Sequence, residues 1–322
     1  AVLALLALVL FLVSLGVGPA ELGLSESLRG LFAGGGEAAG IIMREIRLPR
    51  ALLGLAIGFT LGISGAVLQG LLRNPLAEPG IVGVSAMAAF GAVAVFYSGL
   101  AGSSLYALPA GALLGALAAV LILMALAARS GSTLTLILAG VALSSLSGAL
   151  TSLVLNLSPN PFASYEIIFW LLGSLKDRSM EHVVLALPLV AAGSLLIALS
   201  GRAIDTLSRG EEAAQSLGIH MARTRFLIIA GVALGVGAAT AVAGTIGFIG
   251  LVVPHLVRPL TSRMPSVLLL PAGLGGAGLL LAADIAARLV LPAGELNVGV
   301  LTALIGAPFF LWLVVRSRRG AF

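Results

Sequence analysis

Stretches of about 20 predominantly apolar residues recur along almost the whole chain, and no other feature restricts its fold as strongly. A helix needs about this length to cross the hydrocarbon core of a bilayer, and it satisfies its backbone hydrogen bonds internally. The sequence therefore predicts an all-α, polytopic membrane protein with about ten transmembrane helices in a single domain, residues 1–322. The apolar windows lie at 1 to 19, 50 to 70, 80 to 99, 106 to 128, 134 to 157, 183 to 201, 226 to 244, 245 to 261, 267 to 291 and 299 to 316.

The composition excludes a soluble protein. Only 10% of the residues are charged and 59% are hydrophobic, whereas a soluble domain carries about 25% charged residues. The net charge of +5 comes from arginines scattered between the apolar runs, a pattern typical of loop ends in membrane proteins rather than of nucleic-acid binding. The absence of cysteine excludes disulfides, thiolate metal sites and cysteine nucleophiles.

The basic residues also predict an orientation. An even number of spans places both termini on one side, and the tail "RSRRG" favours the cytoplasm. Eleven basic residues then lie inside and seven outside. The segment "REIRLPR" holds Arg44, Arg47 and Arg50 on the outer side against this rule. They either face an acidic partner or anchor a helix at the lipid headgroups.

Two further patterns lie within the spans. Gly54, Gly58 and Gly62 share one helix face, which favours close helix packing over a dimer seam or the wall of a pathway. Asp284 and Arg288 are four residues apart, so they can form an intramembrane ion pair. Such a pair either stabilises packing or serves a pathway or a docking site.

Catalytic and metal-binding patterns are missing from the sequence. No G-x-x-x-x-G-K-[ST] loop occurs, and Lys176 lacks the glycines of such a loop. His182, His220 and His255 are far apart and do not have the spacing of metal ligands. We therefore expect a chain that is not an enzyme, that has no metal site and no cofactor, and that cannot hydrolyse ATP itself.

Two segments depart from the apolar pattern. The stretch "DTLSRGEEAAQSLGIHMARTR", Asp205 to Arg225, is polar and reads by itself as a solvated loop. After "NLSPNPF", the apolar segment at about 162–173 is too short to cross a bilayer. It is interpreted as a short outer or re-entrant helix.

Several motifs together resemble the permease subunits of the ABC importers for iron chelates, haem and vitamin B12. They are "IRLPR", "SGAVLQGLLRNPLAEPGIVGVS", "LILAGVALS", "GEEAAQSLGI", "AGTIGFIGLVVPHLVRPL", "LLLAADIAARL" and the stretch from Gly294 to Leu313. They follow one another in family order over nearly the whole chain after the first span. Ala86 and Met87 depart from the glycine-rich pattern of many members.

The resemblance implies a type II ABC importer permease that moves a ferric siderophore or haem, with vitamin B12 (cobalamin) as the alternative. It implies a homodimer in the inner membrane of a bacterium, two copies of a cytoplasmic ATPase that bind ATP and Mg, and a periplasmic or lipid-anchored binding protein. An ion-coupled secondary transporter is the alternative from another class. Buried acids for ion coupling are few, because those other than Asp284 fall near predicted helix ends.

The resemblance also implies roles for residues at the outer face and at the gates. Arg47, Arg50 and Arg288 match arginines that receive acidic residues of the binding protein. Charge reversal at Arg47 and Arg50 is expected to weaken docking while the dimer stays folded. Ser132 and Thr133 match the cytoplasmic gate, and the short helix at about 162–173 matches the outer gate.

At the inner face, the resemblance implies that residues 205–219 form coupling helices that contact the ATPase. Leu207, Ala214 and Leu217 can be buried, and Gly210 and Gly218 allow tight turns. Arg223 and Arg225 are expected to be ordinary anchors of the next helix. The matching coupling residues are Ser208, Arg209, Gly210, Glu211, Glu212, Ala214, Leu217, Gly218 and Ile219.

Overall fold

The computed structural model describes residues 1–18, 20, 22, 24–32, 38–102, 104, 106–130, 133–158, 160–261, 264–290 and 296–319. Within these ranges it consists of helices and connecting loops, without a strand. The α-helices are α1 (Val2–Gly16), α2 (Leu24–Phe32), α3 (Ala38–Ile41), α4 (Leu48–Leu72), α5 (Val84–Tyr97), α6 (Ala107–Ser130), α7 (Thr133–Leu157), α8 (Pro161–Leu171), α9 (Met180–Leu199), α10 (Gly201–Leu207), α11 (Glu211–Ser216), α12 (Met221–Ala243), α13 (Ile249–Val257), α14 (Pro265–Val290) and α15 (Val298–Arg319). A π-helical stretch, Ile42–Arg47, joins α3 to α4, and short 3-10 turns occupy Leu100–Gly102 and Arg258–Leu260.

Six helical segments are long and apolar enough to cross a membrane, and four shorter apolar helices accompany them. The long segments are Ala38–Leu72, Ala107–Ala127, Leu134–Leu157, Met180–Leu199, Met221–Ala243 and Pro265–Val290. The shorter ones are Val2–Gly16, Val84–Tyr97, Ile249–Leu260 and Val298–Leu313. The predicted all-α membrane architecture is confirmed, while the number of ten membrane crossings stays a prediction.

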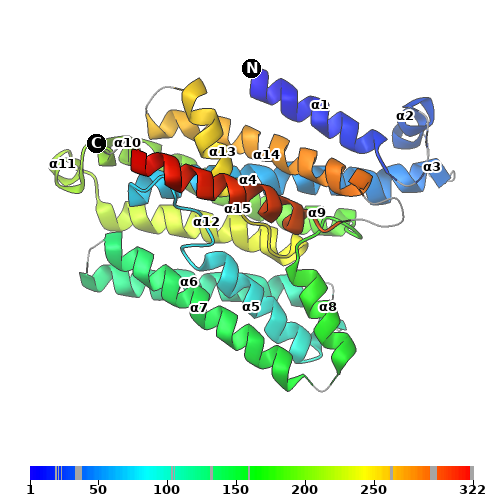
Figure 1. The fold of residues 1–322 in the computed structure, drawn as a ribbon, viewed down its shortest axis with the longest axis horizontal. Coiled ribbons are helices and arrows are strands. Elements are labelled where there is room, and N and C mark those ends of the chain that lie inside the picture. Colours follow the sequence, from blue (N-terminus) through cyan, green and yellow to red (C-terminus); the bar gives the residue numbers. More distant parts are fainter. Residues whose placement is uncertain are drawn as a thin grey trace.

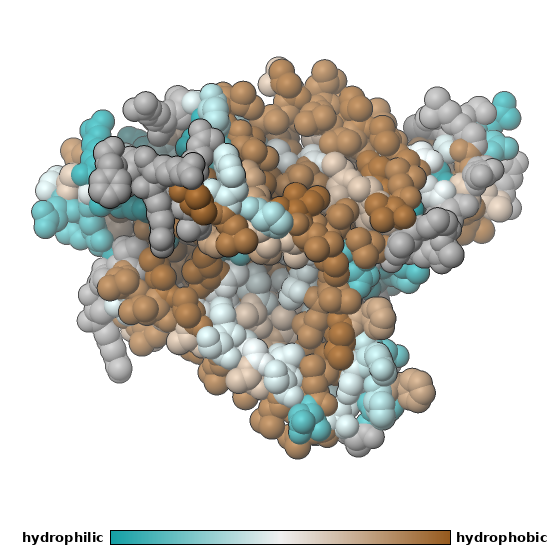
Figure 2. Space-filling view, viewed as in Figure 1, coloured by the Kyte–Doolittle hydropathy of each residue, from teal (hydrophilic) through white to brown (hydrophobic). Residues whose placement is uncertain are grey.

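The helices pack in layers around α4, α12 and α14 (Figure 1). Helices α5, α6 and α7 lie on one side of this centre, and α1 and α13 lie on the other. The short helices α10 and α11 lie at one end of the bundle, together with the last turns of α15, whereas α2 and α3 lie at the opposite end. Hydrophobic residues cover much of the middle of the molecule, and hydrophilic residues gather near its two ends (Figure 2).

Glycines bring α4 and α14 into backbone contact. A Cβ atom built on Gly58 would lie 2.4 Å from the carbonyl oxygen of Gly276, and one on Gly62 would lie 2.0 Å from that of Ala272. Gly54 faces Leu281 of the same helix α14. The packing interpretation of this glycine face is therefore confirmed, because its neighbours belong to the same chain and leave no room for a side chain.

The boundary between the apolar windows 226 to 244 and 245 to 261 lies between α12 and α13. The chain is non-helical from Gly244 to Phe248, and both of these residues have positive φ, 71° and 66°. A Cβ atom on Gly244 would lie 2.1 Å from the carbonyl oxygen of Trp170, so only glycine fits there. The break turns one apolar stretch into two helices and places an extended segment inside the bundle.

Candidate functional site

A buried charge cluster lies at the end of the bundle that carries α2 and α3. Asp284 of α14 is 1% exposed and stands between two arginines. Arg50 of α4 places Nε 3.0 Å and Nη2 2.9 Å from Oδ1 of Asp284. Arg288 places Nη2 2.7 Å from Oδ2. The structure thus contains the Asp284–Arg288 pair that the spacing predicts, and it adds Arg50 from a helix 234 positions away.

Arginines also hold the C-terminal end of α1. The guanidinium of Arg47 donates to the carbonyl oxygens of Leu15 and Gly16, at 3.0 and 3.1 Å. That of Arg288 donates to the carbonyl oxygen of Val17 at 2.7 Å and to the Ser14 hydroxyl at 2.6 Å. The last carbonyls of a helix lack partners within the helix and carry partial negative charge, so cationic donors stabilise them.

These contacts bear on the predicted docking residues Arg47, Arg50 and Arg288. Arg47 is 3% exposed and Arg50 is 8% exposed, and their donors face partners in this chain. A glutamate at position 50 would stand beside the buried Asp284 carboxylate. The burial therefore argues against the expectation that charge reversal leaves the fold intact, because like charges in a buried site repel strongly. The docking role itself stays a prediction.

The predicted coupling segment, residues 205–219, comprises the last residues of α10 and the whole of α11, at the opposite end of the molecule (Figure 1). Gly210 and Gly218, which flank α11, have positive φ of 113° and 83°. Leu207 and Ala214 are buried in the main hydrophobic core. Leu217 is 63% exposed in this chain, so its burial would require a partner surface. Of the remaining residues of the predicted segment, Ser208, Arg209 and Glu212 are exposed, and Glu211, Gly218 and Ile219 complete it.

An ion pair fixes α11 on the long helix that follows it. Nη2 of Arg225 lies 2.6 Å from Oε1 of Glu211, and Arg225 is buried. The expectation that Arg225 is an ordinary surface anchor is therefore wrong, whereas Arg223 is exposed. The opposite charges of these two residues in one polar segment were the only sequence signal for this contact.

Asp205, which sequence reasoning did not single out, caps the N-terminus of α14. Its Oδ1 accepts a hydrogen bond from the backbone N–H of Ser266 at 2.8 Å, and its Oδ2 accepts one from the Ser266 hydroxyl at 2.5 Å. A carboxylate at this position satisfies an unpaired donor and complements the helix dipole. Helix α10 is thereby attached to α14, and only the folded structure brings the two residues together.

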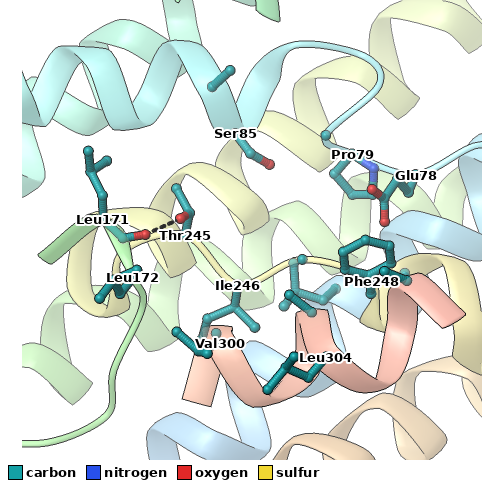
Figure 3. Close-up of a pocket in the computed structure, with 18 of the residues that line it drawn as sticks. Glu78, Pro79, Ser85, Leu171, Leu172, Thr245, Ile246, Phe248, Val300 and Leu304 are labelled. Atoms are coloured by element: carbon teal, nitrogen blue, oxygen red, sulfur yellow. Dashed lines mark hydrogen bonds between the residues drawn. The ribbon is translucent and has the colours of Figure 1, made fainter. Parts of the chain in front are cut away.

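A cavity of about 760 Å³ lies where the extended segment between α12 and α13 meets α8 and α15. Figure 3 shows Leu171 and Leu172 on one side, Glu78 and Pro79 on the other, and Val300 and Leu304 below. The Thr245 hydroxyl donates to the carbonyl oxygen of Leu171, which ties the segment to the end of α8. The wall is mostly apolar. A site of this size with few polar groups suits a sizeable organic ligand.

Glu78 is the acidic residue in the wall of this cavity, and it lies in the connection between α4 and α5. Burial raises the pKa of its carboxyl above the ordinary value, and a hydrogen bond with the backbone of Phe248 acts in the opposite direction. This hydrogen bond links the α4–α5 connection to the start of α13. The sequence placed Glu78 near a helix end but gave no sign of this contact.

The predicted gates are placed in part. The predicted outer gate segment corresponds to α8, Pro161–Leu171, whose end lines the cavity. Ser132 lies outside the described residues. Thr133 is the first residue of α7, and its side chain is not among the parts that the structure describes. Within the described ranges no group of three or more His, Asp or Glu residues could hold a metal ion.

Comparison with known proteins assigns the family. The model of the FecCD transport family matches residues 5–316. The hemin transport system permease protein HmuU of Yersinia pestis is 39% identical over 97% of this chain and 95% of its own length. The cobalamin import system permease protein BtuC of Halobacterium salinarum is 44% identical over 86% of this chain and 74% of its own length.

The fold agrees with that assignment. A solved structure described as an inward-facing conformation of a metal-chelate type ABC transporter superposes with a TM-score of 0.87. It is 33% identical, and the match covers 98% of this chain and 97% of that one. The resemblance noted in the sequence motifs is thus confirmed over almost the entire length, and the chain belongs to the FecCD transport family of ABC importer permeases.

Proposed function

We propose that this permease works as a homodimer in a bacterial inner membrane, with two cytoplasmic ATPase subunits and a binding protein outside. The observation that carries the proposal is the position of α10 and α11 at the end opposite the arginine cluster (Figure 1). One end then offers an ATPase contact and the other a place for substrate delivery. Both termini lie on the cytoplasmic side in this arrangement.

The proposed substrate is a metal chelate, a ferric siderophore or haem. The mostly apolar cavity beside α8 and α15 supports a bulky organic ligand, and the relative from Yersinia pestis is named for hemin. Cobalamin is the second candidate, favoured by the 44% identity to a cobalamin import permease. Both kinds of ligand are large metal complexes, so the cavity does not discriminate between them.

The ATPase contact is proposed to centre on α11, with Leu217 as its apolar element. Leu217 follows the end of α11 and is 63% exposed, whereas Ala214 of that helix is buried. Burying a leucine side chain at an interface contributes about 1.5–3 kcal/mol, or roughly 10- to 100-fold in affinity. Leu217→Asp should therefore weaken ATPase binding at least about tenfold.

Gln215→Asp is the matched control, because Gln215 is also exposed on α11 and is already polar. It introduces the same carboxylate without removing an apolar group. Affinity of the purified permease for its ATPase, measured by biolayer interferometry in detergent, separates the two. Equal losses for both variants, or no loss for either, would exclude Leu217 as the apolar contact.

Docking of the binding protein is proposed at the end that holds Arg47, Arg50 and Arg288. Carboxylates of the binding protein would compete there with the carbonyls of α1 and with Asp284, exchanging internal bonds for intermolecular ones. Arg47→Gln should weaken binding-protein affinity more than Arg44→Gln, because Arg44 lies outside the matched motif. Equal affinities of the two variants and the parent protein would contradict the docking role.

Transport itself is tested in proteoliposomes that contain the permease and its ATPase, with binding protein outside. We expect uptake of labelled haem or ferric siderophore that requires ATP on the ATPase side. Uptake of cobalamin instead would select the second candidate. Uptake without the ATPase, driven by an ion gradient alone, would show a secondary transporter and overturn the proposal.

A further inference from the structure

A second cavity, of about 690 Å³, lies at the end of the bundle that carries α10 and α11. It opens between the C-terminal end of α4, the turn after α13 and the first residues of α14. Its polar wall is formed by Gln69, Arg73, Ser208, His255 and Arg258. None of these residues lines the cavity near α8, and of the predicted coupling residues only Ser208 is among them.

The two arginines of this cavity retain most of their hydrogen-bonding capacity. Arg258 donates through Nη2 to Oε1 of Gln69 at 2.9 Å, and within the described ranges its guanidinium makes no other hydrogen bond or ion pair. The guanidinium of Arg73 makes no hydrogen bond or ion pair with any of the described residues. A guanidinium has five N–H donors, so the two groups together leave most of their donors for a ligand.

The position of Arg258 is fixed by a buried side chain. Gln69 is 4% exposed, and its Nε2 lies 3.4 Å from the carbonyl oxygen of Gly250. Its Oε1 is therefore directed to Arg258, and the guanidinium is held at the cavity wall instead of moving freely in solvent. Arg73 approaches from the end of α4, where its backbone adopts a left-handed conformation with φ 48°.

The cavity wall has no carboxylate to neutralise these charges among its described residues. The acids nearest in sequence to a lining residue are Asp205 and Glu211, each three positions from Ser208. Both oxygens of Asp205 are engaged by Ser266, and Oε1 of Glu211 is paired with Arg225. The cavity is therefore positively charged and is shaped to receive an anion. Guanidinium groups bind phosphate oxygens in pairs of parallel hydrogen bonds, which makes phosphate the best matching chemistry.

Exposed apolar residues adjoin the charged wall. Met264 lines the cavity, and Leu260 lies between the lining residues Pro259 and Thr261, and both of these side chains are exposed. Polar donors beside exposed apolar side chains at a helix end match a molecule with a phosphate head and an apolar tail. This arrangement favours an anionic lipid over an acidic protein segment, because the latter would leave the apolar rim uncovered.

We propose that this cavity binds a phosphate group, held by Arg73 and Arg258, with an anionic lipid headgroup or free phosphate as its source. The site lies beside α10, so its occupant contacts the connection between the coupling segment and α14. The inference concerns a cavity distinct from the one beside α8 and α15, and it holds whichever chelate is carried.

The test uses the purified full-length transporter in nanodiscs that contain phosphatidylcholine with or without phosphatidylglycerol. Retained phosphatidylglycerol is counted by native mass spectrometry for the parent and for Arg73→Gln, Arg258→Gln and Arg258→Lys. Arg223→Gln is the matched control, an exposed arginine at the same end that does not line the cavity. In a second arm, inorganic phosphate is titrated into phosphatidylcholine nanodiscs while the melting temperature is recorded.

We expect one or two tightly retained lipids per transporter, with affinity at least about tenfold weaker in both glutamine variants, unchanged in Arg223→Gln and partly restored in Arg258→Lys. A phosphate-dependent rise in melting temperature that both glutamine variants lose would identify free phosphate as the source. Retention that is equal in all variants, together with no response to phosphate, would overturn the site. Loss of ATPase binding in the glutamine variants without any change in lipid or phosphate binding would also overturn it, in favour of a protein contact.

Discussion

Replacing Asp284 by asparagine tests the buried charge cluster directly. The substitution keeps the shape of the side chain but removes the negative charge that faces Arg50 and Arg288. Both guanidiniums then remain buried without a counter-charge, and removing one partner of a buried pair costs about 3–5 kcal/mol. Arg288 keeps its bonds to Ser14 and Val17, and the asparagine oxygen still accepts one hydrogen bond. We therefore expect a loss near the lower limit, about 3 kcal/mol.

A loss of this size is large beside a total stability of about 5–15 kcal/mol. Denaturant unfolding of the purified chain in detergent, followed by the fluorescence of Trp170 and Trp312, measures it. Asp177→Asn is the matched control, because Asp177 is exposed and has a positive φ that asparagine also tolerates. It should change the free energy of unfolding by no more than about 0.5 kcal/mol.

A second variant separates charge from packing. In Asp284→Asn combined with Arg50→Gln, one of the two uncompensated cations is gone, so the double variant should be more stable than Asp284→Asn alone. A free energy of unfolding within about 1 kcal/mol of the parent for Asp284→Asn would refute the account of the cluster. So would a double variant whose losses simply add.

The other predictions concern helix packing, protonation and the attachment of α10. Gly62→Ala should lower the free energy of unfolding by about 1–2 kcal/mol, because overpacking against the Ala272 carbonyl exceeds the gain in helix propensity. Gly278→Ala is the control in the same unfolding assay. Its Cβ would meet Leu10 at 3.7 Å, so this variant should be neutral or slightly stabilising. Because burial raises the pKa of Glu78, the contribution of its carboxyl to stability is full below the ordinary pKa of 4.5 and is lost as the pH rises through the folded-state pKa. Over that pH window Glu78→Gln should gain stability relative to the parent. Parallel pH profiles of the free energy of unfolding would contradict this prediction. Asp205→Ala should cost about 1–2 kcal/mol and reduce uptake per ATP hydrolysed in proteoliposomes, while Thr206→Ala, which loses only a bond within α10, should leave that ratio unchanged.

The helices could be predicted from the sequence because the apolar runs and the spacing of glycine are local signals. Gly54, Gly58 and Gly62 mark one face whatever they contact, and the structure supplies α14 as the neighbour. The apolar windows divide at residue 244, but the extended stretch from Gly244 to Phe248 could not be predicted, because apolar residues continue through it and tertiary contact with Trp170 and Leu171 stabilises the non-helical backbone.

The candidate site was less accessible to sequence reasoning because its contacts join distant segments. Asp284 and Arg288 are four positions apart in the sequence, so their pairing could be predicted, whereas Arg50 reaches Asp284 from another helix. From the sequence, Arg47 and Arg288 lie near helix ends and could bind a partner protein. In the structure their guanidinium groups donate to carbonyl oxygens at the end of α1. In the same way, amphipathy shows that Leu217 can be buried but not whether the surface that buries it belongs to this chain.

Helix α14 is attached to the rest of the molecule at both ends and along its length. Near its first turn Ser266 binds Asp205 of α10, and near its last turn Asp284 binds Arg50 of α4. Between these points Gly58 and Gly62 bring α4 into backbone contact with it. A displacement of α10 must therefore break the Asp205 bonds or move α14, and α14 cannot slide along α4 without driving backbone atoms together. These contacts join α10, α14 and α4 into one continuous set of packed helices between the predicted coupling segment and the arginine cluster.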